Sequence, residues 1–409
     1  MKKKAFILTA LLSTLCFTAT HAQKRAFTIP DAYRLKTAIS PVVSIKGQLA
    51  YYVSASDLKT QKSSVAIYLD GQPLKDANGY APQWSSDGNK LYYTASTENG
   101  PQLFCYNMQT RQTQQLTHYA LGTQGAVVSP DGNLIAFAAE VWPAIGGANG
   151  KANAEANERK AKAPVQAHMA DKLLFRHWTD YTDGKYWHII IYNIAKDTYT
   201  DVTPGEFHSP TFSPSGPEGF TFSPDSKELC YLSNHDPHPE ASTNADLWTV
   251  PVEGGTARNL TADNKAWDGS PQYSPDGRYI AYRYQTIPSY ESDRFRLAII
   301  DRATGQKTVL TEHFDNWVDN FKWSNDSKAI YFLGEVRGYE PLYKVTLKTK
   351  KIETVIPQRA ISSFDFDNKG NFYYTYSTTA KPTAIYKATP SRRGLNEQQL
   401  THFNDAFEQ

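Results

Sequence analysis

Ser129-Pro130-Asp131-Gly132, followed by the apolar run Leu134-Ile135-Ala136-Phe137, is the stretch that decides the fold. Proline presets the second position of a type I turn, aspartate can hydrogen-bond the backbone just ahead, and glycine takes the left-handed position. The phrase recurs, each time after an aromatic residue and before a strand-like run, at Trp84–Gly88, Phe222–Ser226, Tyr273–Gly277 and Trp323–Ser327. Five turns with matching flanks predict a repeat architecture.

Each turn opens a unit whose parts follow in the same order. A strand, a second strand and a polar hairpin lead to a closing Leu-Thr pair, as at Leu116-Thr117, Leu260-Thr261, Leu310-Thr311 and Leu400-Thr401. With degenerate first and last copies included, the turns stand at positions 44, 85, 129, 223, 274, 324 and 367, in steps of 41, 44, 94, 51, 50 and 43 residues. Units of 40 to 50 residues with about four strands are propeller blades. The sequence therefore predicts an all-β, seven-bladed β-propeller over about residues 39–405.

The 94-residue step is interpreted as a third blade that carries an insertion at about 143–186. Residues 145–164 are rich in Ala, Asn, Lys and Gly, which predicts an exposed, mobile segment. Met169, Leu173 and Trp178 stand near helical spacing, so we expect a helix over 165–178. An eighth blade is the alternative, but the middle of this step lacks strand-like runs.

The N-terminus has the pattern of a signal peptide over residues 1–22. Lys2 to Lys4 precede the apolar run Ala5–Phe17, and a small-x-small site stands before Gln23. An uncleaved anchor is the alternative. In residues 23–38, the order Thr28-Ile29-Pro30-Asp31 predicts a short helix to about Thr37. We expect a periplasmic or secreted protein with no membrane association after cleavage.

The charge balance limits the expected binding partners, and the positions of the cysteines indicate whether they form a disulfide. Removing three lysines leaves 40 basic against 41 acidic residues, so no basic face is implied and nucleic acid is not an expected partner. Cys105 and Cys230 lie in predicted strands of the second and fourth repeats. Because blades so far apart should not touch, we expect two buried free thiols.

Two further stretches join the repeats in a family resemblance. They are Leu174-Phe175-Arg176-His177-Trp178 and Tyr290-Glu291-Ser292-Asp293-Arg294. Together with the repeats they resemble the N-terminal propeller of exported prolyl oligopeptidase-family serine peptidases, of the dipeptidyl-peptidase and acylaminoacyl-peptidase type. The resemblance covers about residues 25–405. It implies a domain that gates and orients peptides for a C-terminal α/β-hydrolase domain.

The catalytic signature of that family is missing from the sequence. Its Gly-x-Ser-x-Gly nucleophile elbow does not occur, and the nearest fragment, Gly269-Ser270, lacks the flanking glycines. The last repeat ends at Leu400-Thr401, and residues 406–409 form a C-terminal end without a hydrolase domain. We therefore assign no catalytic residue and expect this chain to be catalytically silent alone; whether it serves an enzyme with a separate hydrolase chain stays open.

Three residues near the insertion are candidates for contact with substrate: Trp178, Asp180 and Glu206. The dipeptidyl peptidase IV branch of the family uses two adjacent glutamates for the peptide N-terminus, and this sequence has no Glu-Glu pair. A carboxylate at 180 or 206 could pair with an ammonium, and Trp178 could offer a cation–π face. The alternative is that Trp178 anchors the insertion and the acids are solvated.

No cofactor or metal is expected. His235-Asp236-Pro237-His238 has metal-binding residue types, but a proline-containing loop with two histidines makes a poor site.

Two functions remain open. The first is the propeller of a prolyl oligopeptidase-type peptidase, with a peptide and a hydrolase domain or chain as partners and an exposed apolar face for docking. The alternative is a stand-alone periplasmic propeller of the TolB type that binds a protein or peptide. Peptide specificity and oligomeric state are not encoded in any pattern found.

Overall fold

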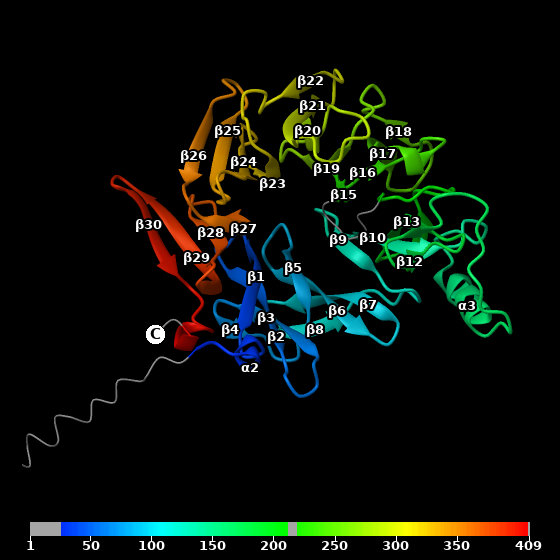
Figure 1. The fold of residues 1–409 in the computed structure, drawn as a ribbon, viewed down its shortest axis with the longest axis horizontal. Coiled ribbons are helices and arrows are strands. Elements are labelled where there is room, and N and C mark those ends of the chain that lie inside the picture. The colour runs from blue at the N-terminus through cyan, green and yellow to red at the C-terminus, as the bar shows by residue number, and fades with distance from the viewer. Residues whose placement is uncertain (1–25, 212–218, 408–409) are drawn as a thin grey trace, which may run out of the picture.

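The computed structural model describes residues 26–211 and 219–407, which form a ring of small sheets around a central axis (Figure 1). The predicted signal peptide, residues 1–22, lies outside the described residues. None of the helices within the described ranges has the length and apolar character that a bilayer span requires.

The described residues form seven four-stranded antiparallel sheets, which confirms the predicted propeller. The first three blades contain β1 (Lys36–Val43), β2 (Leu49–Ser56), β3 (Ser63–Leu69), β4 (Gln72–Pro73); β5 (Tyr80–Trp84), β6 (Lys90–Thr97), β7 (Gly100–Asn107), β8 (Gln112–Gln115); and β9 (Gln124–Val128), β10 (Leu134–Val141), β13 (Tyr186–Asn193), β14 (Thr198–Asp201). The third blade is built from strands on both sides of the insertion, which together span the long step between the turns at 129 and 223. The described residues therefore contain no eighth blade.

The other four blades follow in chain order and are each built from consecutive strands. They contain β15 (Phe220–Phe222), β16 (Glu228–Ser233), β17 (Asp246–Pro251), β18 (Arg258–Asn259); β19 (Asp268–Tyr273), β20 (Tyr279–Tyr284), β21 (Arg296–Asp301), β22 (Lys307–Val309); β23 (Val318–Trp323), β24 (Ala329–Gly334), β25 (Leu342–Thr346), β26 (Ile352–Ile356); and β27 (Ala360–Phe366), β28 (Phe372–Thr378), β29 (Lys381–Ser391), β30 (Gly394–Gln399).

The Ser-Pro-Asp-Gly turn joins the first and second strands of a blade and is fastened by its own side chains. The Ser129 hydroxyl donates to Asp131 Oδ1 (2.5 Å) and accepts from the backbone N–H of Leu134 (2.9 Å). The Asp131 carboxylate also accepts from the N–H of Asn133 (3.1 Å). The same pair of serine bonds recurs at Ser85, Ser223, Ser274 and Ser324. The repeated sequence is thus a repeated hydrogen-bond pattern.

Two turns carry serine where glycine would be easier. Ser226 and Ser327 have φ of 60° and 59°, a region that strains residues with a Cβ. Their hydroxyls accept from the backbone N–H of Asp131 (3.2 Å) and Asp276 (3.1 Å), each in the turn of the preceding blade. The strained serine therefore links neighbouring blades.

The innermost strands are linked by a second set of bonds. Gln83 Nε2 donates to the Ala126 carbonyl and Gln272 Nε2 to the Phe321 carbonyl, both at 2.7 Å and both to the following blade. The indoles of Trp84 and Trp323 donate backward, to the carbonyls of Val42 and Gln272, both at 3.1 Å. These contacts hold blades that share no strand.

The first and last blades also share no strand, so side chains close the ring. Asn404 accepts from the Lys36 N–H (2.9 Å) and donates to the Lys36 carbonyl (2.7 Å). Asp365 on β27 accepts from the Val43 N–H (2.7 Å). An apolar cluster that includes Tyr51 and Ile385 fills the seam behind these bonds.

Because neighbouring strands of a blade run in opposite directions, the connections between them lie alternately on two faces of the ring, called here the turn face and the loop face. The turn face carries the Ser-Pro-Asp-Gly turns and their equivalents, at 44–48, 85–89, 129–133, 223–227, 274–278, 324–328 and 367–371. The loop face carries connections between second and third strands (57–62, 98–99, 142–185, 234–245, 285–295, 335–341, 379–380) and the links between blades (74–79, 116–123, 202–211, 260–267, 310–317, 357–359). Because β1 starts and β30 ends at the loop face, the described residues begin and end there, and the rings of Phe27 and Phe407 lie 6.2 Å apart.

The insertion differs from its prediction. The expected helix over 165–178 is wrong: this stretch contains only the short strand β11 (Arg176–His177), which pairs with β12 (Asp180–Tyr181). The helix is α3 (Gly150–Ala161), inside the segment expected to be irregular. Met169 and Trp178 are 86% and 84% exposed, so their spacing marks no buried helical face.

The N-terminal helix and the cysteines match the sequence more closely. α2 (Ile29–Ala32) begins in a capping box of Thr28 and Asp31, and is shorter than expected because β1 starts at Lys36. Cys105 and Cys230 are free and buried, as predicted.

We predict that Asn404→Ala lowers the free energy of unfolding by about 1–3 kcal/mol, because it removes both side-chain bonds that join blade one to the C-terminal segment. Asn396→Ala, at an exposed position of β30, is the matched control and should change stability by less than about 0.5 kcal/mol. Urea unfolding measures both. Equal, small effects would contradict closure through Asn404.

Candidate functional site

A cavity of about 760 Å³ opens on the loop face between the third-blade insertion and the fourth blade. Its wall comes from four separate segments, namely residues 168–175 and 181–186 of the insertion, the link 206–211, and the loop 234–239. The site therefore depends on how the insertion is fixed to its blade.

Asparagine and small residues fix the first half of the insertion. Asn153, fully buried in α3, accepts from the Trp142 N–H (2.8 Å) and donates to the Gly146 carbonyl (2.9 Å). At Gly150 an added Cβ would meet the Tyr119 ring at 2.5 Å, so glycine permits the helix to lie against the second-blade link. The helix packs through a polar, narrow surface, which explains why apolar periodicity did not reveal it.

Tyr181 of the β11–β12 hairpin and the preceding residues 168–175 form the outer wall of the cavity. The His168 ring stacks on Tyr181 with centroids 3.8 Å apart, and His168 Nδ1 lies 2.8 Å from Asp183. Lys160 of α3 also reaches Asp183, with 2.9 Å between Nζ and Oδ2. Asp183 thereby ties the hairpin to the helix.

Aromatic rings form the inner wall. His235 stacks between Phe207 (3.8 Å) and Trp248 (4.3 Å). His208 accepts at Nδ1 from the Trp187 N–H (3.3 Å). Burial, with smaller contributions from nearby His188 and His177, lowers the pKa of His208 to about 4, so this ring is neutral near pH 7. The cavity wall is thus mainly aromatic and apolar, and it includes the imidazoles of His168, His208 and His235.

Of the three candidate residues, the structure places Glu206 in the cavity wall and the other two elsewhere. Glu206 pairs with Lys172 across the rim, with 2.9 Å between Oε2 and Nζ. Trp178 occupies the hairpin turn with φ of 50°, and Asp180 is exposed on β12; neither lines the cavity. The exposed ion pair is weak, so a ligand ammonium could replace Lys172 on Glu206.

Sequence reasoning missed the aromatic lining, including His168, Tyr181, Phe207 and His235. These residues stand in four segments that no motif connects, and only the insertion pointed toward them.

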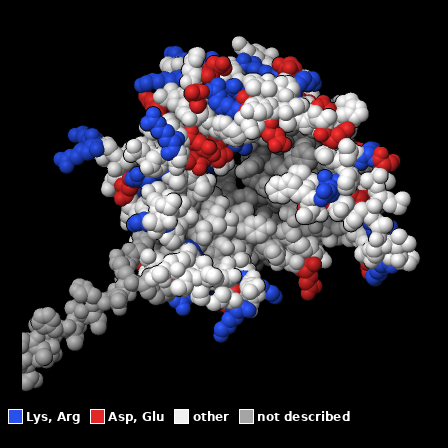
Figure 2. Space-filling model, in the orientation of Figure 1, with Lys and Arg blue, Asp and Glu red and all other residues white. Residues whose placement is uncertain are grey.

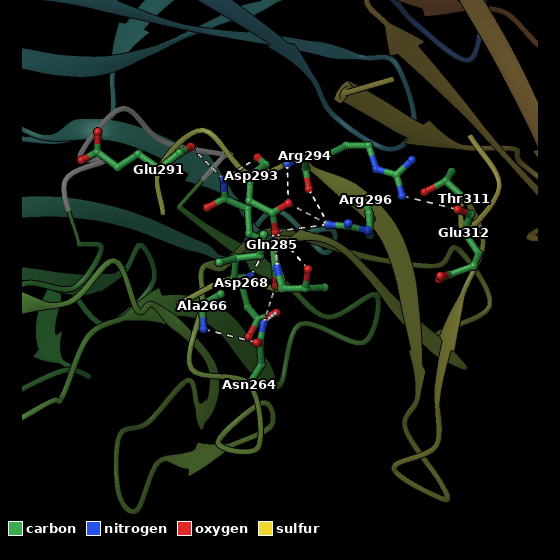
Figure 3. Close-up of polar contacts among 12 residues, drawn as sticks. Asn264, Ala266, Asp268, Gln285, Glu291, Asp293, Arg294, Arg296, Thr311 and Glu312 are labelled. Atoms are coloured by element: carbon green, nitrogen blue, oxygen red, sulfur yellow. Dashed lines mark hydrogen bonds and ion pairs between the residues drawn. The ribbon is translucent and has the colours of Figure 1, made fainter. Parts of the chain in front are cut away.

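The stretch Tyr290–Arg294 organises the fifth-blade loop rather than the cavity (Figure 3). Asp293 accepts from the backbone N–H groups of Thr286 (2.6 Å) and Ile287 (3.1 Å) and pairs with Arg296 (3.3 Å). Burial opposes ionisation, but these hydrogen bonds and the guanidinium hold the pKa of Asp293 below its usual value. Gln285 donates to the carbonyls of Glu291 and Asp293. The loop is therefore rigidly built.

A second acidic spot on the loop face lies over blades five and six. Burial raises the pKa of Glu340 to about 8, and the neighbouring carboxyls of Asp319 and Glu335 add to the effect. Arg283 pairs with Asp319 at 2.9 Å. No motif in the sequence connects these carboxyl groups.

Hydrolytic chemistry finds no support in the buried histidine of the third blade. His188 Nδ1 lies 2.7 Å from Asp201, as in a triad, but its Nε2 lies 2.8 Å from the Gly205 carbonyl. With both nitrogens facing acceptors, this ring cannot take a proton from a nucleophile.

Metal-binding groups are likewise few. Within the described ranges no three or more His, Cys, Asp or Glu side chains gather as a metal site. His235 lies in the aromatic stack while His238 is exposed, so these two do not converge.

Charged side chains of both signs are interspersed on the face seen in Figure 2, without a continuous basic surface there. Large exposed apolar side chains of the described residues belong to the loop face or the N-terminal segment, with Ile45 on the turn face as the exception. On the loop face they include Met169, Trp178, Tyr290 and Tyr339.

Comparison with known proteins identifies relatives of this chain. Dipeptidyl-peptidase 5 of Porphyromonas gingivalis is 30% identical over 395 residues, which cover 92% of this chain and 56% of the relative. This chain is a β-propeller related to dipeptidyl-peptidase 5. It spans about half the length of the curated relatives it matches. No protein-family model matches it.

Solved structures show the same fold. Acylaminoacyl peptidase from Pyrococcus horikoshii superposes with a TM-score of 0.69 at 15% identity, over 93% of this chain and 54% of that one. The propeller domain of the Trilobed protease from Pyrococcus furiosus, described as having an open velcro topology, gives a TM-score of 0.60 at 16% identity, over 90% of this chain and 97% of that one. The family resemblance, predicted from the repeats together with the stretches at 174–178 and 290–294, is confirmed by the relationship to dipeptidyl-peptidase 5, and the solved structures confirm the fold.

We predict that stability falls as the pH drops from about 6.5 to about 4, in part through His208. The unfolded chain, with an ordinary histidine pKa near 6.5, binds a proton in this range while the folded chain does not. His208→Asn keeps a hydrogen-bond acceptor and should remove up to about 3 kcal/mol of this loss. Urea unfolding at pH 7, 5.5 and 4 measures it.

His313→Asn, at an exposed histidine on another blade link, is the control. An unchanged pH dependence in His208→Asn would show that His208 does not stay neutral in the fold.

Proposed function

We propose that this propeller admits and orients peptides for a serine hydrolase domain that docks on its loop face, as part of an exported dipeptidyl-peptidase-type enzyme. One observation supports this most strongly: the cavity, most exposed apolar side chains and both ends of the described residues share the loop face. A domain joined beyond the described residues at either end would therefore start on the same face as the cavity.

The cavity suits a peptide better than a compact polar metabolite. Its aromatic rings can bury an apolar side chain, while Glu206 at the rim offers a carboxylate for a free N-terminal ammonium. The Glu206 carboxylate raises the pKa of Lys172, which indicates that a cation is already favoured there.

The chain supplies no nucleophile of its own in this proposal. The sequence lacks the elbow motif, and the His188–Asp201 pair is saturated by a backbone carbonyl. Export to the periplasm or the medium belongs to the proposal and is supported by the pattern of residues 1–22.

We predict that a peptide with a free N-terminus binds the mature chain more tightly than its N-acetylated form, by about two- to fivefold, as expected for an exposed ion pair. Glu206→Gln should reduce binding of the free peptide equally and leave the acetylated peptide unaffected. Calorimetric titration of both peptides completes a double-mutant cycle. Glu240→Gln, on the neighbouring loop and outside the cavity wall, is the matched control.

Additive effects of acetylation and Glu206→Gln would exclude Glu206 as the ammonium partner. The same cycle with Glu340→Gln tests the acidic group over blades five and six. Coupling between peptide acetylation and Glu340→Gln would show that the ammonium binds there rather than at Glu206.

We also predict that the mature chain alone neither reacts with a fluorophosphonate probe nor cleaves dipeptidyl substrates. If the probe labels the purified chain and heat denaturation before labelling abolishes the reaction, the assignment of catalysis to another domain is refuted. Sequencing the DNA that follows the codon for Gln409 gives an independent test: an open frame with Gly-x-Ser-x-Gly supports the proposal, and an unrelated gene favours the stand-alone alternative.

A further inference from the structure

A threonine near the end of a blade marks an equivalent buried position in five blades. The Oγ1 atoms of these threonines accept from the N–H of a third-strand residue at 2.8–2.9 Å, in the pairs Thr117–Leu103, Thr203–Ile189, Thr261–Leu247, Thr311–Leu297 and Thr401–Ile385. We call the residue just before the third-strand partner the slot residue. The slot residues are Gln102, His188, Asp246, Arg296 and Ala384.

Three of these slots contain a donor aimed at a loop carbonyl. Gln102 Nε2 reaches the Tyr119 carbonyl (2.7 Å), His188 Nε2 lies 2.8 Å from the Gly205 carbonyl, and Arg296 Nη1 reaches the Arg294 carbonyl (2.8 Å). The seventh blade has alanine in its slot. A slot therefore normally contains a hydrogen-bond donor or an apolar side chain.

The fourth-blade slot instead contains an acceptor, Asp246, and a second acidic residue, Asp268 on β19 of the fifth blade, lies beside it. Asp246 Oδ2 accepts from Asn259 (2.8 Å), and Asp268 Oδ1 accepts from Asn264 (3.0 Å; Figure 3). Asp246 Oδ1, Asp268 Oδ2 and Asn244 Oδ1 are buried and have no hydrogen-bond partner. The three residues are only 5%, 1% and 2% exposed. Unmatched buried oxygens of this kind are costly and call for an explanation.

Backbone pairing brings these three residues together. The Asp268 N–H donates to the Ala245 carbonyl at 2.8 Å, and Ala245 and Trp267 form a parallel bridge. Alternation along both segments then turns Asn244, Asp246 and Asp268 to the same side. The Asp246 carboxyl lies near both the Asp268 carboxyl and the Asn244 side chain.

We propose that the fourth-blade slot binds a hard divalent cation, Ca²⁺, through Asp246 Oδ1, Asp268 Oδ2 and Asn244 Oδ1. One bound cation can satisfy all three unpaired oxygen atoms, whereas a proton on one carboxyl cannot. Two carboxylates and an amide oxygen are ligands that Ca²⁺ prefers, and its flexible coordination leaves room for carbonyls and water. The sequence suggested no metal because these ligands lie on two blades and include an amide.

The slot adjoins the cavity through Asp236. Asp236 lines the cavity and accepts from Asn244 Nδ2 (3.3 Å) and from the Ser242 hydroxyl (2.7 Å). A bound cation would hold the loop 234–245, and with it one wall of the cavity, in a single conformation.

Chelator-treated mature chain titrated with CaCl2 tests the proposal by calorimetry and by thermal unfolding. We expect one Ca²⁺ per chain and a rise in the unfolding midpoint of about 3 °C at a concentration one hundred times Kd. Asp246→Asn and Asp268→Asn should each abolish both responses. Asn244→Ala, which removes an uncharged ligand, should weaken binding by about tenfold.

Asp263→Asn, at an exposed acid near the slot, is the matched control and should bind Ca²⁺ as the wild type does. Asp246→Gln places the second-blade slot residue in the fourth blade and should fold without a calcium response. Wild-type chain that binds no Ca²⁺ would overturn the proposal, as would retained binding in Asp246→Asn or Asp268→Asn. Midpoints that depend on pH but not on Ca²⁺ would identify a proton on Asp268 as the occupant.

Discussion

The Asp365 carboxylate stands where the ring closes, and it joins three blades. It accepts from the Val43 N–H of the first blade and pairs with Lys322 of the sixth at 2.9 Å, while its own strand belongs to the seventh. No strand is shared between first and last blades, so the circle rests on such polar contacts and on the apolar seam behind them. Each blade thus takes its strands from one stretch of the chain, interrupted in the third blade by the insertion, and the described residues begin and end on the loop face.

That arrangement separates the tasks of the two faces. The turn face is a continuous set of short, self-fastened turns whose serine and aspartate side chains bond within and between blades. The loop face carries the insertion, the aromatic cavity and the exposed apolar side chains. Structural regularity on one face leaves sequence freedom on the other, where loops can differ without disturbing the ring.

The fold could be read from the sequence because its turns repeat a local hydrogen-bond pattern. Ser129 and Asp131 bond within six residues, so their spacing is visible in one dimension. The insertion helix could not be read in the same way. α3 packs through Asn153 and Gly150 rather than an apolar stripe, whereas Met169 and Trp178, which suggested a helix, face solvent.

The candidate site was only partly accessible to sequence reasoning. Glu206 is a sequence candidate because it lies near the insertion, and it does line the cavity, whereas Trp178 and Asp180 occupy the outer hairpin. The aromatic lining and the acidic slot of Asp246 and Asp268 join segments from different blades or loops. Such groups become visible only when the ring brings their segments together.

Amide hydrogen exchange tests the central claim, that a hydrolase domain covers the loop face. The mature chain is compared alone and joined after Gln409 to the α/β-hydrolase domain of a dipeptidyl-peptidase relative. We expect slower exchange in the loop-face segments 168–175, 285–295 and 335–341, with exchange in the turns at 85–89, 129–133 and 274–278 unchanged. Protection confined to the turn face, or none on either face, would contradict this claim.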